Sequence, residues 1–470
     1  VLDHFDPAGA SGDQHIEVAV GKSMQLAGKK IAVIGMGKTG IAAAVFLDDN
    51  GAAVVAVDEK PRSRWGAEFE QIAHRPRLVL GRYDETALDG ADLVVPSPGI
   101  PPRHPILTAA RQKKIPILSE IELAYRFIRV PIIAVTGTNG KTTTTTLLGE
   151  ILARAGKKVH VGGNIGNPLI EYAGTAQTDD FIVAEISSFQ LQWAETFSPH
   201  AAILLNITCD HVNYHGSFEE YRRIKGRIFE HQRENDLAVL NAEDPHQEGL
   251  GPSLRAAVVR FSSVRPQSPG LCLENGCIVY RHPGGSEERY PSEMIRLPGL
   301  HNVENVMAAV AAARFCGCSK ESITEAVSQF RGLPHRIEFA GEKRSVVFYD
   351  DSKGTNVDAV VRALQTFSSP VILLLGGRDK DGNFEALKPL LRAKTKQVVL
   401  FGEARDRIEP QLGGAIPIAK ETTLKEAVLR AYRDAVPGDI VLLSPGCASF
   451  DAFANYKERG NHFKEVVGNL

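Results

Sequence analysis

The stretch AVTGTNGKTTTTTLLGEIL, residues 134–152, contains a β-strand, a glycine turn and the start of a helix in one run. Pro131-Ile132-Ile133 precedes it with β-favouring residues, and apolar residues recur at helical spacing after the five threonines. A strand that turns on glycine into a helix directs backbone N–H groups at one point, which attracts phosphate. The stretch therefore predicts a nucleotide-phosphate loop within an α/β fold.

Gly140-Lys141-Thr142 matches the end of a P-loop, in which a lysine binds the β- and γ-phosphates and a hydroxyl binds Mg²⁺. The match is not strict, because Val135 stands where the usual pattern has its first glycine. A threonine-rich helix cap is the alternative. A cap does not require a lysine, and consecutive threonines are poor helix formers, so we expect an ATP or GTP site.

A second glycine loop, Gly35-Met-Gly37-Lys-Thr-Gly40, follows an apolar strand and opens a helix, and Asp58 ends the next strand. This spacing is typical of a dinucleotide-binding loop. The loop alone leaves three interpretations open, namely a nicotinamide or flavin site, a site for another nucleoside diphosphate, and a structural turn. An enzyme that joins ATP to a nucleotide-linked substrate needs both loops, whereas a dehydrogenase needs only this one.

The chain has 470 residues, of which 43% are hydrophobic and 23% charged, and its formal net charge is −2. This length predicts two to four domains, and the charge gives no reason to expect nucleic acid as a partner. We find no run of about 18 apolar residues that would span a membrane. The six cysteines suit neither a disulfide scaffold nor a zinc site, so we expect reduced thiols and a cytoplasmic location. We further expect a monomer that binds small molecules.

Strand and helix patterns alternate along the chain, which predicts an α/β protein with mainly parallel sheets covered by helices. Three strand-to-glycine openings, at 30–47, 134–152 and 370–384, are each interpreted as the first crossover of a separate α/β unit. The predicted segments are a polar N-terminal extension at 1–23, a Rossmann-like domain at 24–120, a P-loop ATPase-like domain at 121–333 and a Rossmann-like C-terminal domain at 334–470.

These motifs resemble the Mur ligases and their relative folylpolyglutamate synthase, in which ATP activates a carboxylate that is then coupled to an amine. Further motifs follow in the family's order: VGGNIG (161–166), AEISSFQL (184–191), NITCDHVNYHGSFEEYRRIKGRIF (206–229), GLHNVENVMAAVAAA (299–313) and LPHRIE (333–338). DDSKGTN (350–356) and SPGCASFDAFANYKERGNHF (444–463) are similar to the members of the family that add D-glutamate.

The resemblance implies that ATP, UDP-N-acetylmuramoyl-L-alanine and D-glutamate yield ADP, phosphate and the extended UDP-muramoyl dipeptide through an acyl phosphate. It implies four catalytic residues, Lys141, His211, Lys225 and Lys353. ATP would contact Gly137, Thr138, Asn139, Gly140, Lys141, Thr142, Thr143, Asn305, Arg336 and Asp351. Two Mg²⁺ ions, or Mn²⁺, would be held by Thr142, Glu185, His211 and Lys225, the last carrying a carbamate derived from CO₂.

The resemblance also implies contacts for the other two substrates. The UDP substrate would contact Gly37, Lys38, Thr39, Asp58, Glu59, Lys60, Ser97, Gly99, Asn164, Ser187 and Gln190. D-Glutamate would contact Thr355, Lys380, Ser449, Phe450 and Tyr456. The loop after His211 departs from the family, because Val212-Asn213-Tyr214 stands where an acidic residue and an arginine are usual.

Several alternatives stay open at this point. From the residues alone, Lys225 is as well explained as a solvated helix lysine, PSPGI (96–100) as a plain loop, and His301 and Asn302 as a helix N-terminal cap. For the whole protein, the alternatives are a nucleotide sensor without turnover, a nicotinamide oxidoreductase, and a ligase that joins another amino acid to another carboxylate.

Overall fold

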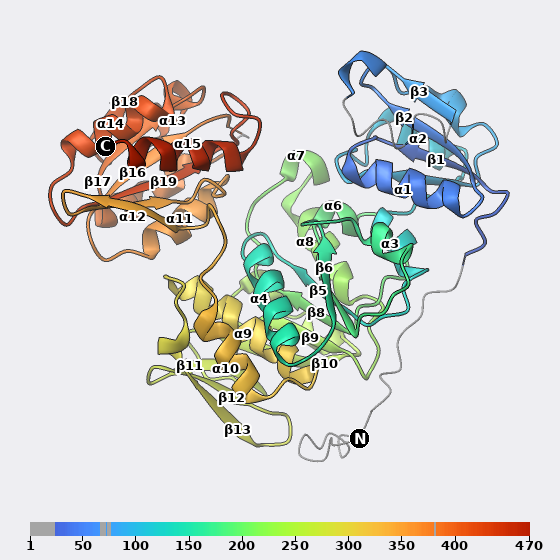
Figure 1. The fold of residues 1–470 in the computed structure, drawn as a ribbon, viewed down its shortest axis with the longest axis horizontal. Coiled ribbons are helices and arrows are strands. Elements are labelled where there is room, and N and C mark those ends of the chain that lie inside the picture. Colours follow the sequence, from blue (N-terminus) through green and yellow to red (C-terminus); the bar gives the residue numbers. More distant parts are fainter. Residues whose placement is uncertain (1–23, 66–71, 73–76, 380–381) are drawn as a thin grey trace. The chain divides into compact units, whose positions relative to one another are not determined.

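The computed structural model describes residues 24–65, 72, 77–379 and 382–470. The predicted extension at 1–23 lies outside the described residues. Two compact units are formed, one running to Met294 and including Glu304–Ser328, the other made of Ile295–Val303 and Gln329–Leu470. Three separate sheets (Figure 1), two of them in the first unit, confirm the predicted three-domain α/β fold.

The N-terminal sheet is parallel and is packed on both faces by helices. Its order is β3-β2-β1-β4, with β1 at Lys30–Ile34, β2 at Ala53–Asp58, β3 at Arg77–Leu80 and β4 at Leu93–Pro96. Side chains alternate along a strand. Ile31 and Val33 therefore join the apolar cluster of α1 (Lys38–Asp49), and Ala32 and Ile34 join that of α2 (Pro105–Gln112).

The central sheet has the order β13-β12-β11-β10-β9-β8-β5-β7-β6, and it is parallel except for the pairings of β12. Its strands are β5 (Ile132–Thr136), β6 (Val159–Gly163), β7 (Phe181–Glu185), β8 (Ala201–Leu204), β9 (Leu237–Asn241), β10 (Ala257–Ser262), β11 (Gly270–Glu274), β12 (Cys277–Arg281) and β13 (Glu287–Pro291). The helices are α3 (Glu120–Tyr125), α4 (Lys141–Arg154), α5 (Leu169–Ala173), α6 (Ser188–Leu191), α7 (Val212–His215), α8 (Phe218–Gly226), α9 (Leu300–Phe315) and α10 (Lys320–Gln329).

The C-terminal sheet has the order β14-β15-β19-β16-β17-β18, and only β14 runs antiparallel among its described strands. The strands are β14 (Glu338–Lys343), β15 (Val346–Asp350), β16 (Val371–Gly376), β17 (Thr395–Phe401), β18 (Ile418–Lys420) and β19 (Ile440–Gly446). One face packs α11 (Val357–Gln365), α12 (Lys388–Lys394) and α13 (Arg405–Leu412). The other packs α14 (Leu424–Asp434) and α15 (Tyr456–Gly468).

The interpretation of 370–384 as a first crossover is wrong. β15 and α11 precede β16, so this opening is the second crossover of its sheet. The earlier turn, DDSKGTN, does not have the paired glycines that mark the other two openings, which is why the glycine pattern missed it.

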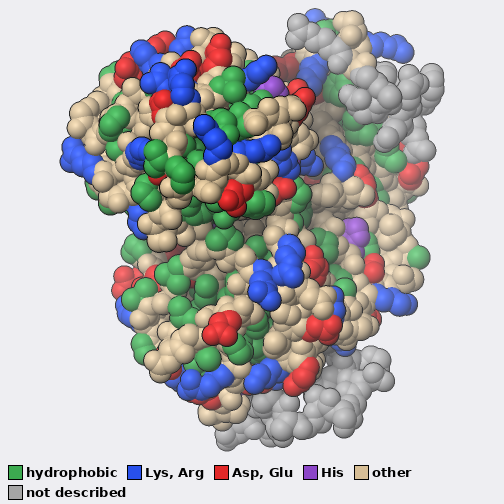
Figure 2. All heavy atoms as spheres, turned by 60° about the vertical axis from the view of Figure 1, so that its left-hand side comes forward, with side chains coloured by type: hydrophobic (Ala, Val, Ile, Leu, Met, Phe, Trp, Pro, Cys, Tyr) green, Lys and Arg blue, Asp and Glu red, His purple; other side chains and the backbone are tan. Residues whose placement is uncertain are grey.

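Charged side chains of both signs are interspersed over the face drawn in Figure 2, in keeping with the formal charge of −2. Within the described ranges, the helices are all too short or too polar to cross a bilayer.

Candidate active site

The carboxyl edge of the central sheet brings together segments that are far apart in the sequence. Thr136 at the end of β5 pairs with Leu204 of β8, and Glu185 at the end of β7 pairs with both Val135 and Gly163. In a parallel sheet all strands end at the same edge, which is where α/β proteins bind ligands. The phosphate loop, Glu185 and the segment leading to His211 therefore share one edge.

Two glycines give the phosphate loop its shape. Gly137 has φ 151° and Gly140 has φ 88°, conformations that side chains rarely tolerate. A Cβ atom on Gly140 would overlap the side-chain oxygen of Asn305, and one on Gly137 would lie 3.0 Å from Leu205 Cβ. Gly140 immediately precedes α4, so the loop presents the N-terminus of a 14-residue helix. The threonine-rich-cap interpretation is wrong, because the residue at the cap position is glycine and offers no side chain.

The segment that follows β8 and the side chain of Tyr221 in α8 hold this loop in place. Asn206 Oδ1 accepts from Asn139 N at 2.8 Å, and Asn206 Nδ2 donates to Asn139 O at 3.0 Å. Thr138 Oγ1 lies 3.0 Å from the Tyr221 hydroxyl and accepts from Thr208 N at 2.9 Å. Asn206 and Tyr221 were not among the predicted site residues. For Asn206, the sequence offered one indication, namely an asparagine directly after an apolar run.

Two lysines contact the carbonyl groups of the loop. Lys141 Nζ donates to Gly137 O and Thr138 O, each at 2.8 Å, and Lys225 Nζ donates to Gly137 O at 2.8 Å. The Lys225 side chain is 1% exposed, so the solvated-lysine interpretation is wrong. Burial, and then the nearby charge of Lys141, hold the pKa of Lys225 well below its usual range. The Lys225 ammonium also lies 4.8 Å from the centre of the Tyr221 ring.

Glu185 offers an oxygen that fits a metal ion. Asn164 Nδ2 donates to its Oε1 at 2.7 Å, whereas Oε2 is buried and has no hydrogen-bond partner among the described atoms. A buried carboxylate oxygen without a partner is costly unless a cation binds it. Thr142, the first threonine of α4, follows the loop at the same edge, and oxygen ligands of this kind suit Mg²⁺.

His211 stands at a strained turn that precedes α7. It has φ 53°, its N–H donates to Asp210 Oδ1 at 2.9 Å, and its Nε2 lies 3.6 Å from Asp210 Oδ2. Its ring packs on Phe189 with 4.6 Å between centroids. A non-glycine residue in this conformation persists only where neighbouring contacts fix it, a common feature of functional sites.

The N-terminal sheet forms a second loop cluster at its own carboxyl edge. Ile34 pairs with Val57 and with Pro96, so the ends of β1, β2 and β4 meet there. The buried Asp58 carboxylate accepts from Met36 N at 2.6 Å and from Lys60 N at 2.8 Å, which ties the glycine loop to β2.

The remaining predicted UDP contacts in this cluster have different surroundings. Ser97 Oγ donates to Gly35 O at 2.6 Å, and Lys38 Nζ donates to Gly166 O at 2.7 Å and Asn167 Oδ1 at 2.9 Å. The positions of Gly37, Glu59, Lys60 and Gly99 are exposed, and Thr39 is half-buried. A Cβ on Gly37 would meet nothing within 4 Å, so space for a ligand lies beside it.

Ser187 and Gln190 are engaged with each other. Ser187 caps α6 by accepting from Gln190 N at 3.3 Å, and Gln190 Oε1 accepts from Ser187 N at 2.9 Å. This reciprocal capping box fixes the segment after Glu185. Asn164, the third residue predicted to contact the muramoyl peptide, lies on Glu185 as described above.

In the second unit, the parallel strands of the C-terminal sheet also end at a common edge. Asp350 pairs with Leu443 and Gly376 with Gly446, so the loops after β15, β16 and β19 share one edge. These loops carry all five predicted residues that the structure describes there, namely Asp351, Lys353, Thr355, Ser449 and Phe450, and Tyr456 follows at the start of α15. Lys380 lies outside the described residues.

Four of these residues differ in their surroundings. Asp351 is buried, accepts from Ser444 Oγ at 2.7 Å, and burial raises its pKa to about 7. Lys353 Nζ lies 4.1 Å from the centre of the Tyr456 ring. Ser449 is buried, whereas Phe450 is 60% exposed.

The sequence relationships agree with this arrangement. Residues 29–119 match the family description "Mur ligase MurD-like, N-terminal domain", residues 135–313 "Mur ligase middle domain", and residues 335–447 "Mur ligase, glutamate ligase domain". The chain is 54% identical over 446 residues to the UDP-N-acetylmuramoylalanine--D-glutamate ligase of Syntrophus aciditrophicus, covering 94% of this chain and 98% of the relative. The chain belongs to the Mur ligase family. A protein of the same name from Geobacter metallireducens is 45% identical, with 95% and 99% coverage.

Solved Mur ligase structures share the fold. A pseudomurein peptide ligase type C from Methanothermus fervidus superimposes with a TM-score of 0.60 at 20% identity, covering 94% of this chain and 99% of that one. The UDP-N-acetylmuramate-alanine ligase of Thermotoga maritima gives 0.58 at 21% identity, with the same coverage. At this identity the likeness concerns the fold alone.

Arg459 is a residue of this Mur ligase that the sequence reasoning did not single out, although it lies within a quoted motif. Its guanidinium is fully buried and donates to Ser352 Oγ at 2.9 Å, Ser352 O at 2.7 Å and Cys447 O at 3.1 Å. It therefore ties the loop after β15 to the loop after β19. Burial lowers the pKa of Arg459 to about 10.

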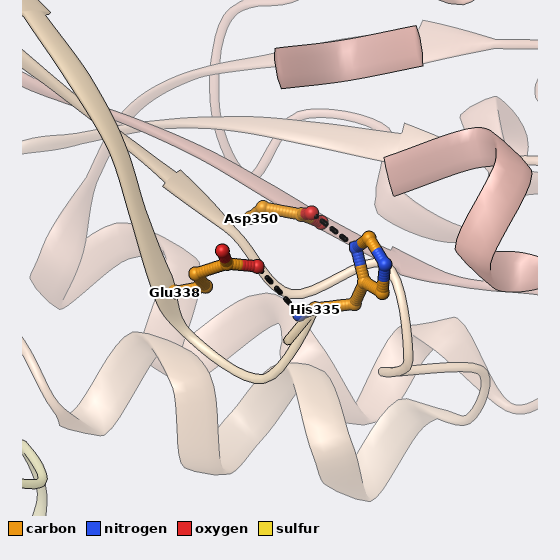
Figure 3. A group of neighbouring side chains, drawn as sticks. All are labelled: His335, Glu338 and Asp350. Atoms are coloured by element: carbon orange, nitrogen blue, oxygen red, sulfur yellow. Dashed lines mark hydrogen bonds and ion pairs between the residues drawn. The ribbon is translucent and has the colours of Figure 1, made fainter. Parts of the chain in front are cut away.

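In the second unit, the side chains of His335, Glu338 and Asp350 form a cluster (Figure 3). Their nitrogen and oxygen atoms of the kind that could bind a metal lie within 4.8 Å of one another. His335 Nδ1 lies 2.7 Å from Asp350 Oδ2, and Glu338 Oε2 accepts from His335 N at 2.8 Å. Both Glu338 oxygens also accept from Lys464 Nζ at 3.0 Å. Each of the three side chains is therefore bonded to another protein group. Together these bonds form a clamp, in the sense that they fix the backbone on both sides of Arg336.

The backbone on each side of Arg336 is left-handed, with φ 65° at His335 and 48° at Ile337. Isoleucine rarely adopts this conformation, so the clamp is needed to hold it. The Arg336 charge lowers the pKa of Asp351, which opposes part of the effect of burial.

The position of His301 and Asn302 corrects one expectation. Helix α9 begins at Leu300, so both lie within its first turn, and Asn302 Nδ2 donates to Pro298 O at 2.7 Å. An N-cap side chain accepts from the helix rather than donating outward. The cap interpretation of these two residues is therefore wrong. Asn305, one turn further along, is the residue beside Gly140.

Proposed function

We propose that this protein is an ADP-forming ligase that joins D-glutamate to UDP-N-acetylmuramoyl-L-alanine in the cytoplasm, as a step of peptidoglycan precursor synthesis. One observation carries the proposal: a phosphate loop, a buried lysine and a buried carboxylate with an unpartnered oxygen converge at one sheet edge. The two relatives that match 94–95% of the chain are both UDP-N-acetylmuramoylalanine--D-glutamate ligases, which supports the choice of substrates.

The chemistry requires an activated acid, because a carboxylate does not react with an amine while its leaving group is oxide. Transfer of the γ-phosphoryl group of ATP to the alanyl carboxylate creates an acyl phosphate with a good leaving group. Attack by the D-glutamate amine then forms the amide and releases phosphate. Two anions must meet in the first step, so positive charge and oriented N–H groups are needed around the phosphates.

In this proposal the amides of Gly137, Gly140, Thr142 and Thr143 hold the phosphates together with the Lys141 ammonium. The amides of Thr138 and Asn139 instead donate to Asn206 and shape the loop. Asn305, Arg336 and Asp351 contact the base, ribose and transferring phosphate. The low pKa of Lys225 supports carbamate formation, because the neutral amine is the form that attacks CO₂. The product exchanges a cation for a pair of oxygens that a hard metal ion prefers.

Thr142 and Glu185 would hold one Mg²⁺ ion, and His211 and carbamylated Lys225 a second, with Mn²⁺ as a substitute. The ions supply charge neutralisation at the phosphates when bound. The unpartnered Oε2 of Glu185 is the feature that fits such a ligand set. Lys353 would stabilise the acyl phosphate.

The other two substrates are assigned to residues of all three domains. Gly37, Lys38 and Thr39 bind the diphosphate of the UDP substrate, Asp58, Glu59, Lys60, Ser97 and Gly99 its uridine, and Asn164, Ser187 and Gln190 the muramoyl peptide. Thr355 and Lys380 bind the D-glutamate α-carboxylate, and Ser449 with the backbone of Phe450 and Tyr456 binds the side-chain carboxylate. Domain limits at 24–120, 121–333 and 334–470 and a monomeric state belong to the same proposal.

A phosphate-release panel tests the assignment. ADP and phosphate are expected only when UDP-N-acetylmuramoyl-L-alanine and D-glutamate are both present with MgATP. Release with L-glutamate, L-lysine or a folate in place of these substrates would reject the substrate assignment. A change in NADH absorbance on mixing would instead favour an oxidoreductase.

A further inference from the structure

The loop that carries His211 is a single short helix between two left-handed residues. Helix α7 occupies four residues, with His211 at φ 53° on one side and Gly216 at φ 89° on the other. Because so short a helix has little stability of its own, the position of His211 depends on what α7 contacts.

On one side α7 packs against α6. The Phe189 ring lies 4.2 Å from that of Tyr214 and 4.6 Å from that of His211, measured between centroids. His215 Nε2 lies 3.0 Å from Ser188 Oγ. These contacts attach the loop to the segment that follows Glu185.

On the other side α7 contacts the segment that follows β4. The hydroxyl of half-buried Tyr214 donates to Ile100 O at 3.0 Å. Three residues after Ile100, the exposed Arg103 guanidinium lies against Gly216, where a Cβ atom would overlap its Nη2. The C-terminal half of the short helix and the residue that follows it are therefore bound by one segment, 100–103, which follows β4.

That segment continues the turn beside the first glycine loop. Ser97 Oγ donates to Gly35 O at 2.6 Å, and Ile100 N donates to Ser97 O at 3.0 Å. The Ile100 side chain lies 3.1 Å from the position of a Cβ on Gly35. One turn thus contacts the glycine loop on one side and the His211 loop on the other.

We propose that Tyr214 is a positioning residue that couples binding of the UDP substrate at residues 97–100 to the placement of His211. The inference rests on the proposed function, in which Ser97 and Gly99 contact uridine. A substrate that orders this turn also fixes Ile100 O, and the hydrogen bond from Tyr214 then restricts α7. Coupling between two sites is reciprocal, so a metal ion at His211 tightens binding of the UDP substrate by the same factor.

The expected size of the coupling follows from the single hydrogen bond between Tyr214 and Ile100. A single neutral hydrogen bond changes an equilibrium by about two- to tenfold. Tyr214→Phe removes the hydroxyl and keeps the ring on Phe189. Tyr290→Phe is a matched control, because it removes a hydroxyl bonded to Glu288 at 2.6 Å within β13.

Hydrogen–deuterium exchange of the metal-free protein, with and without UDP-N-acetylmuramoyl-L-alanine, provides the test. The substrate is expected to slow exchange at 35–40 and 97–100 in every variant. It is expected to slow exchange at 209–217 in the wild type and in Tyr290→Phe, but not in Tyr214→Phe. Equal protection of 209–217 in Tyr214→Phe and wild type, or no protection there in either, would overturn the coupling. No protection at 35–40 in the wild type would reject the proposed function and this inference with it.

A Mn²⁺ titration followed by the electron paramagnetic resonance of the free ion gives a second readout. The substrate is expected to lower the Mn²⁺ dissociation constant of the wild type about two- to tenfold, and to leave that of Tyr214→Phe unchanged. Arg103→Ala, at an exposed position, is expected to weaken the same effect, and it serves if Tyr214→Phe does not fold. A full substrate effect in both variants would contradict the proposal.

Discussion

Lys225 Nζ lies 2.8 Å from the carbonyl oxygen of Gly137, which is 88 residues earlier in the chain. Helix α8 thus delivers a buried amine to the phosphate loop, next to a second lysine, Lys141. Burial of Lys225, and then repulsion from the nearby Lys141 ammonium, lower its pKa and favour its neutral form.

A carbamate on Lys225 is expected to be detectable directly. With ¹³C-bicarbonate, the wild type should give a carbamate ¹³C resonance that is lost in Lys225→Met, because the thioether cannot react with CO₂. Turnover of Lys225→Met is expected to fall at least about 10²-fold. Lys158→Met, at an exposed position, controls for loss of a surface lysine. A ¹³C signal that survives in Lys225→Met would assign the carbamate to another amine.

Replacement of Lys141 by Ala should reduce turnover at least about 10²-fold, because in the proposed mechanism the ammonium would stabilise charge on the transferring phosphate. Steady-state ADP release by Lys141→Ala, compared with Lys158→Ala, checks this. A near-wild-type rate would exclude Lys141 from phosphate binding.

Glu120 makes the stability of the first unit depend on pH. It is 1% exposed, Oε1 accepts from Ile170 N at 2.7 Å and Oε2 has no partner among the described atoms, and burial raises its pKa from 4.5 to about 7. The folded protein keeps the proton between these pH values while the unfolded chain has lost it. The stabilising contribution is therefore complete below pH 4.5 and is lost as pH rises to about 7.

Glu120→Gln imitates the protonated acid and should remove this dependence. The variant is expected to match the wild type near pH 5 and to be more stable by up to about 3 kcal/mol at pH 8. Differential scanning calorimetry from pH 5 to 8 measures the difference, with exposed Glu293→Gln as the control. A constant difference in melting temperature across that range would contradict the assignment.

Asp351 should make ATP binding weaker as pH falls. In the proposed site a ribose hydroxyl would donate to the ionised carboxylate of Asp351, and with a pKa of about 7 this form is lost as pH falls from 8 to 6. MgADP affinity measured by calorimetry should therefore weaken more steeply toward low pH in the wild type than in Asp351→Asn. Parallel pH profiles for the two proteins would rule out this role.

Arg459→Lys should weaken the connection between the loop after β15 and the loop after β19, because an ammonium cannot reach three acceptors with the geometry of a guanidinium. The second unit is expected to lose about 2–4 kcal/mol of stability, and the KM for D-glutamate should rise at least about tenfold while the KM for ATP changes less. Arg433→Lys, whose arginine side chain is 69% exposed, is the control. An equal rise in both KM values would indicate a general loss of structure.

Long-range contacts are the part that sequence reasoning could not supply. The glycine loops and their strands were predicted because their turns are determined locally, by residues such as Gly137 and Gly140. The burial of Lys225 was not predicted, because a helix lysine has the same local pattern whether it points into solvent or against another segment of the protein, here the phosphate loop. The transfer of 295–303 to the second unit and the role of Arg459 depend in the same way on partners distant in the chain.

The sequence by itself determined the α/β class, the two phosphate loops and the order of the motifs, since backbone turns and side-chain periodicity are local properties. Only the tertiary structure decided which charges are buried, which carboxylate oxygen lacks a partner, and which loop supports which. Those properties arise from desolvation and packing between segments that the folded sheets bring to one edge.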